Sequence, residues 1–99
     1  MAVSSPPPVL APEPAVLLVL LPPASPAALT TTLRQLQGRL GAQIRVLRID
    51  EATHPAVVRS FGTPALPACV LLRQGVELWR HQGLPDDAGT LGTLLEALR

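Results

Sequence analysis

Two apolar runs dominate the first half of the chain. Residues 15–21 form a continuous stretch of alanine, valine and leucine with a proline on each side. Such short runs are typical of strands buried on both faces of a sheet. In residues 44–49, apolar positions alternate and the run ends at Asp50 and Glu51. Both segments are predicted strands.

Between these strands, leucines recur at steps of three and four residues, which predicts an amphipathic crossover helix. They are Leu29, Leu33, Leu36 and Leu40. Ser25 is expected to cap this helix, Pro26 to stand in its first turn, and Gly41 to follow its last residue.

The second half predicts a short helix, a hairpin and a final helix. The short helix begins at Pro55, with His54 as its expected cap, and ends at Gly62. Residues 68–73 and 76–82 flank a Gln-Gly turn, which indicates a β-hairpin.

The final helix has an acidic start and an apolar stripe. Asp86 and Asp87 stand where a helix N-terminus favours negative charge. The stripe that follows consists of Leu91, Leu94, Leu95 and Leu98.

The predicted order is therefore β-α-β-α-β-β-α. The first two strands need a crossover and the last two only a tight turn, so we expect a mixed α/β sheet with helices on both faces. Residues 15–99 form this domain. Residues 1–14 are rich in proline and are interpreted as a disordered tail, with a polyproline ligand for a partner as the alternative.

Composition and charge exclude several classes of function. The chain has 99 residues, of which 47% are hydrophobic and 2% aromatic, enough for one aliphatic core. A net charge of +1 with mixed signs gives no basic stripe for nucleic acid. No apolar run is long enough to span a membrane, and no cation precedes the first run as in a signal peptide, so a cytoplasmic location is expected.

The segment from residue 49 to residue 83 resembles the thioredoxin family. The family has an Ile-Asp pair at a strand end, an aromatic-Gly pair after a short helix, a cis-proline before a hairpin, and glycines in and after that hairpin. The matching residues here are Ile49-Asp50, Phe61-Gly62, Leu66-Pro67, Gly75 and Gly83. The resemblance covers residues 15–99 and implies a thioredoxin-like fold that lacks the family's first strand and first helix.

The resemblance places a degenerate active site after the first strand. The family's Cys-X-X-Cys corresponds to Ala24, Ser25, Pro26 and Ala27. Dithiol exchange needs two sulfurs, so both redox positions are lost. The family's buried aspartate and its lysine neighbour correspond to Leu18 and Val46. We therefore expect a redox-inactive module that binds a protein or peptide or acts as a scaffold. We expect no enzyme, because both redox cysteine positions are alanine.

The peptide-binding candidates also follow from the resemblance. In the family, the backbone before the cis-proline pairs with an extended peptide, which here implies Leu66 and Pro67, with Gly83 and Leu84 beside them. The alternative is that Pro67 only fixes the hairpin conformation.

Cys69 and Trp79 carry the remaining alternatives. Cys69 is the sole cysteine, which excludes an internal disulfide but leaves a thiol-dependent redox activity as the alternative function. Trp79 lies on a predicted edge strand, where it either packs against the last helix or joins a homodimer. His54 and His81 have no ligand at metal spacing, so neither a metal nor a cofactor is expected.

Overall fold

A computed structural model describes residues 14–99, so the predicted tail lies outside the described residues except for Pro14. This part of the chain contains four strands, three α-helices and one 3-10 turn at Gly41–Gln43. The strands and α-helices are β1 Ala15–Leu21, α1 Ala28–Leu40, β2 Ile44–Asp50, α2 Pro55–Ser60, β3 Ala68–Arg73, β4 Val76–Gln82 and α3 Ala88–Ala97. The predicted order of elements is confirmed.

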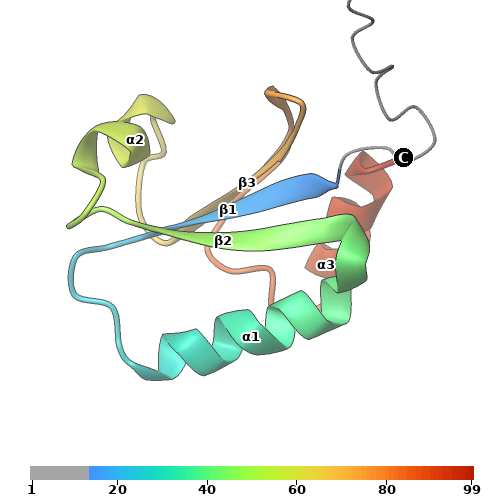
Figure 1. Cartoon of the computed structure of the whole chain (residues 1–99), viewed down its shortest axis with the longest axis horizontal. Helices are drawn as coiled ribbons and strands as arrows, with labels where there is room; N and C mark the ends of the chain where they lie inside the picture. Colours follow the sequence, from blue (N-terminus) through green and yellow to red (C-terminus); the bar gives the residue numbers. More distant parts are fainter. Residues whose placement is uncertain (1–13) are drawn as a thin grey trace, which may run out of the picture.

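The four strands form one mixed sheet in the order β2-β1-β3-β4. β1 is parallel to β2 and antiparallel to β3, and β3 and β4 form the predicted hairpin. In the register, Leu20 is opposite Ala68, and Ala68 is opposite Gln82. The segments after β1, before β3 and after β4 therefore meet at one end of the sheet, which is the end where β2 also leads into α2 (Figure 1).

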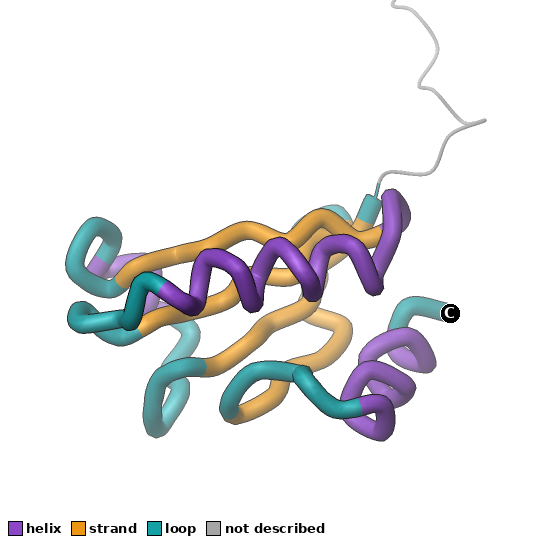
Figure 2. Tube along the Cα trace, turned by 90° about the horizontal axis from the view of Figure 1, so that it is seen from below, coloured by secondary structure: helices purple, strands orange, loops and turns teal. Residues whose placement is uncertain are grey.

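Helices cover both faces of this sheet, as predicted. Alternate β1 residues such as Leu17 and Val19 pack with α1 and α3 in the larger core cluster. Leu18 and Leu20 point the other way and pack with Val58 of α2. Figure 1 shows α1 and α2 on opposite sides of the sheet, and Figure 2 looks from the side where α1 crosses in front of the strands. Each fully buried leucine contributes about 1.5–3 kcal/mol to stability.

A β-bulge shapes β4. Leu71 is opposite Trp79 and Leu72 is opposite Glu77, which leaves Leu78 as an extra residue. Leu78 and Trp79 therefore both pack against the larger core cluster, although strict alternation would place neighbouring residues on opposite faces of the sheet. The half-buried Trp79 ring stacks on His81 with 5.5 Å between ring centroids. Trp79 therefore packs against the core cluster that includes the last helix, which is one of the two expected alternatives. Its strand, β4, is an edge of the sheet.

Gln37 of α1 pairs with the free edge of β2. Its side-chain amide donates to the carbonyl oxygens of Ile44 at 2.8 Å and Gly41 at 3.0 Å, and its Oε1 accepts from the Val46 N–H at 2.8 Å. This is the bonding pattern of a neighbouring strand, supplied by one side chain. It satisfies edge groups that would otherwise be open to pairing with another chain.

Replacing Gln37 with alanine is expected to lower the free energy of unfolding by about 1–3 kcal/mol, because three hydrogen bonds to backbone are lost, two of which are partly buried. Urea denaturation followed by circular dichroism measures the change. Gln35→Ala, on the same helix and exposed, is the matched control. Equal stability of the two variants would show that the Gln37 bonds contribute nothing.

Asp87 caps α3. Its carboxylate accepts hydrogen bonds from the Thr90 hydroxyl and from the Thr90 N–H, the latter at 3.0 Å. These bonds, led by the one from the hydroxyl, lower the pKa of Asp87 below 3.8. A carboxyl whose pKa is depressed in the folded state stabilises the protein above the unfolded pKa, and this stabilisation is lost as the pH falls through the folded pKa.

Acid is therefore expected to destabilise the wild type more than the Asp87→Asn variant. The measurement is the melting temperature between pH 5 and pH 2, where the difference between wild type and Asp87→Asn should shrink as the pH falls. Asp86→Asn is the control, because the Asp86 carboxylate makes no hydrogen bond within residues 14–99. A difference that stays constant with pH would contradict this role for Asp87.

Candidate functional site

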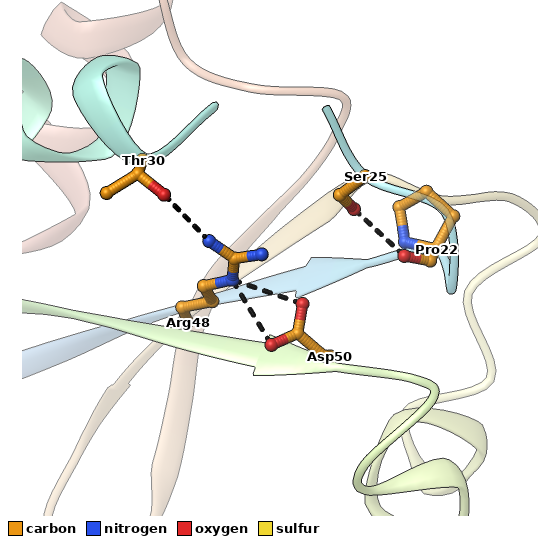
Figure 3. Close-up of polar contacts among 5 residues, drawn as sticks. All are labelled: Pro22, Ser25, Thr30, Arg48 and Asp50. Carbon is orange, nitrogen blue, oxygen red and sulfur yellow. Dashed lines mark hydrogen bonds and ion pairs between the residues drawn. The ribbon is translucent and has the colours of Figure 1, made fainter. Parts of the chain in front are cut away.

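The segment that corresponds to the degenerate motif connects β1 to α1. Ala24, Pro26 and Ala27 are exposed, and Ser25 is half-buried. The Ser25 hydroxyl donates to the Pro22 carbonyl oxygen at 2.9 Å (Figure 3). All four side chains thus lie in one exposed loop at the end of the sheet, and none of them offers a nucleophile with a base beside it.

Ser25 does not cap the helix, so that prediction is wrong. α1 begins at Ala28, and Ala27 stands at the N-cap position with no side-chain hydrogen bond. Ser25 lies two residues before the N-cap position, and its hydroxyl bonds to the carbonyl oxygen of Pro22 instead of the free N–H groups of the first turn. His54 does stand at the N-cap of α2, but its side chain makes no cap hydrogen bond.

A polar bridge fixes the start of α1 against β2. The Arg48 guanidinium donates to the Thr30 hydroxyl at 3.1 Å, and its Nε lies 3.1 Å from both carboxylate oxygens of Asp50 (Figure 3). Both charged side chains are about one-third exposed, so the pair contributes modestly to stability. The sequence shows no signal for this bridge, because Thr30 and Arg48 are 18 positions apart.

The turn before β3 lies beside the loop after β4. The Leu66–Pro67 peptide bond is cis, and the Pro67 carbonyl oxygen accepts from the Gly83 N–H at 2.8 Å. The Gln82 side chain donates to the carbonyl oxygens of Ala65 at 2.7 Å and of Pro67 at 3.1 Å. Gln82 is a contributor that the sequence reasoning missed, since an exposed strand glutamine carries no recognisable pattern.

Leu66 is a residue of this turn whose backbone N–H and carbonyl oxygen both remain open. Its side chain packs against the smaller core cluster, and the residue is half-buried. Within residues 14–99, no hydrogen bond uses its N–H or its carbonyl oxygen. Leu66 therefore offers one donor and one acceptor at the end of the sheet where the 24–27 loop and Gly83 also lie.

Cys69 is buried beneath this turn. Its side chain is 0% exposed in the larger core cluster, and its thiol donates to the Gly83 carbonyl oxygen at 3.4 Å. Burial raises the pKa of Cys69 from 9.0 to about 12. Since the thiolate is the reactive species, a thiol in this position has little nucleophilic character.

The positions that correspond to the family's buried charged pair are apolar and do not face each other. Leu18 packs in the smaller core cluster, on the α2 side of the sheet, whereas Val46 packs against the larger core cluster, on the α1 side. The residue opposite Leu18 on β2 is Leu47. Within residues 14–99 no polar or charged side chain is fully buried, so the described part of the chain holds no counterpart of the family's buried charged pair.

The described part of the chain has neither a cluster of metal-ligating side chains nor a membrane-spanning helix. Nowhere in residues 14–99 do three His, Cys, Asp or Glu side chains gather as metal ligands would. None of the helices there has the length and apolar character needed to cross a bilayer.

Comparisons with known proteins agree with this architecture. No protein-family model matches the sequence. A thioredoxin-like protein of Synechocystis sp. is 34% identical over 56 residues, which are 57% of this chain and 53% of that protein. The chain thus spans about half the length of this curated relative.

Solved structures show the same fold. A thioredoxin-2 described as a component of malaria parasite protein secretion machinery superposes with a TM-score of 0.68 at 22% identity, over 84% of this chain and 82% of that one. A cysteine-to-serine mutant of thioredoxin from Entamoeba histolytica gives a TM-score of 0.63 at 17% identity, over 85% and 81%. At these identities the likeness establishes the fold.

Proposed function

We propose that this chain, a member of the thioredoxin-like superfamily by its fold, binds an extended protein or peptide segment and has no dithiol redox activity. The observation that carries the proposal is the unpaired backbone of Leu66 beside the cysteine-free 24–27 loop. An extended peptide could pair with the Leu66 N–H and carbonyl oxygen as a short added strand.

The neighbouring segments support the same surface. Gly83 is held against Pro67 by its N–H, which brings Leu84 to the same end of the sheet as the 24–27 loop. Alanines at positions 24 and 27 leave that loop flat and accessible. The recognition surface proposed here comprises residues 24–27, 66–67 and 83–84.

The alternative function, a redox activity through Cys69, has less support. A dithiol reaction needs a second sulfur that the sequence lacks, and the thiol is buried with a raised pKa. A homodimer through the Trp79 edge stays a prediction, as does a cytoplasmic location.

Substitution of Ala24 with arginine is expected to weaken peptide binding at least about tenfold, because the new side chain would obstruct the recognition surface. The probe is a set of peptides selected on the wild-type chain from a random dodecapeptide phage library, and their affinities are measured by calorimetry.

Ala42→Arg is the matched control, since Ala42 is exposed near the opposite end of β2 and the charge change is the same. Equal loss of affinity in both variants, or no selected peptides at all, would reject the proposed function.

A further inference from the structure

Gln82 ends β4 directly beside the turn that carries Leu66. In the register it is opposite Ala68, the first residue of β3, so it lies at the end of the sheet where the turn enters β3. Its Nε2 donates to the Ala65 carbonyl oxygen at 2.7 Å and to the Pro67 carbonyl oxygen at 3.1 Å. One side-chain amide therefore holds the backbone on both sides of Leu66.

These two bonds engage the flanking carbonyl groups on the β4 side of the turn. The Pro67 carbonyl oxygen also accepts from the Gly83 N–H at 2.8 Å, so both of its lone pairs are used. The 24–27 loop follows β1, which lies on the other side of β3 from β4. The carbonyl oxygens of Ala65 and Pro67 are thus turned toward β4 and bound there.

Leu66 remains as the residue of this segment that can form a complete backbone pair. In an antiparallel hydrogen-bonded pair, one residue supplies both its N–H and its carbonyl oxygen. Pro64 and Pro67 have no N–H, and so cannot supply both groups. The Ala65 carbonyl oxygen is already bound by Gln82. An extended ligand therefore finds both groups open at Leu66.

The bonds of Gln82 act on geometry more than on folding stability. The side chain is exposed, and fixing a glutamine in one conformation costs rotamer entropy, which offsets much of the gain from two hydrogen bonds that water can replace. A turn that is already held in one conformation spares a ligand the cost of ordering it. The expected benefit of Gln82 is therefore to binding.

We propose that Gln82 is a positioning residue for peptide binding: it holds the turn so that an extended peptide pairs with Leu66 in a single register. This inference rests on the proposed function, since a peptide must first bind at this surface. It also restricts the ligand, because the peptide residue opposite Leu66 must supply an N–H and so cannot be proline.

The test is an N-methyl scan of a peptide selected on the wild type from the dodecapeptide phage library. Each backbone amide of the peptide is methylated in turn, which removes one N–H, and calorimetry measures the affinity for wild type, Gln82→Met and Gln35→Met. Methionine has about the length of glutamine and no N–H donor in its side chain. Gln35→Met is the matched control, because Gln35 is exposed and lies on α1.

For the wild type and Gln35→Met, methylation is expected to weaken binding at least about tenfold at one peptide position, the residue opposite Leu66. Gln82→Met should bind the unmethylated peptide about three- to tenfold more weakly, and the methylation penalty should spread over several positions. Gln82→Glu keeps the shape of glutamine but its carboxylate donates no hydrogen bond, so it should give the same spread. A loss of stability alone would lower the melting temperature and leave one sensitive position.

Two results would overturn the inference. One is a single sensitive position in Gln82→Met and Gln82→Glu, as in the wild type, whatever their affinity. The other is a wild type in which no single position is sensitive. If either is found while Ala24→Arg weakens binding and Ala42→Arg does not, the role of Gln82 is rejected and the proposed function stands. If the wild type selects no peptides, both are rejected.

Discussion

The Cys69 thiol of the native protein is expected to react with Ellman's reagent at pH 8 about a thousand-fold more slowly than the thiol of the urea-unfolded chain. Burial raises its pKa from 9.0 to about 12, which lowers the thiolate fraction by that factor. The side chain is also 0% exposed, so the reagent must wait for an opening of the core. Stopped-flow absorbance measures both rates.

The reactivity of this thiol also distinguishes peptide binding without redox activity from a redox activity through Cys69. In an insulin-reduction assay with thioredoxin reductase, wild type and Cys69→Ala should both give the background rate, because no second sulfur is present for dithiol exchange. Rapid labelling of the native thiol, together with turnover that Cys69→Ala abolishes, would favour the redox alternative instead.

Replacing Leu94 with alanine is expected to lower the free energy of unfolding by about 2–5 kcal/mol, since the side chain fills the core between α3 and the sheet. That is a large part of the stability of a small domain, which is about 5–15 kcal/mol. Urea denaturation measures the loss.

Leu95→Ala is the matched control on the same helix. Leu94 is 0% exposed and Leu95 is 37% exposed, so the same substitution at the neighbouring position should cost much less. If the two variants are equally stable, α3 is not packed on the sheet as the structure has it.

The order of the elements follows from the sequence because each has a strong local signal. The apolar runs of β1 and β3 and the leucine periodicity of α1 need no knowledge of tertiary contacts. The β4 bulge could not be predicted, because Leu78 and Trp79 share a face only once the pairing with Leu71 and Leu72 is fixed.

The site is less predictable than the fold. The cysteine-free loop is visible in the sequence because the resemblance to the thioredoxin family places it, and the hairpin fixes Leu66 beside Gly83. The helix cap at Ser25 was wrong because propensity ignores how far the hydroxyl lies from the first turn. Gln37 of α1 bonds to the backbone of β2, and Gln82 of β4 bonds to the backbone of Ala65 in the turn before β3. A single glutamine has no local sequence pattern that would predict either set of bonds.

Pairing of a peptide with the Leu66 backbone, without any thiol chemistry, is the interaction on which the proposed function depends. The most direct measurement is the amide spectrum of the isotopically labelled protein during titration with a library-selected dodecapeptide. We expect large shifts for the Leu66 and Gly83 amides, slowed hydrogen exchange at Leu66, and the same response in Cys69→Ala. Binding that leaves the Leu66 amide unshifted and still freely exchanging would contradict it.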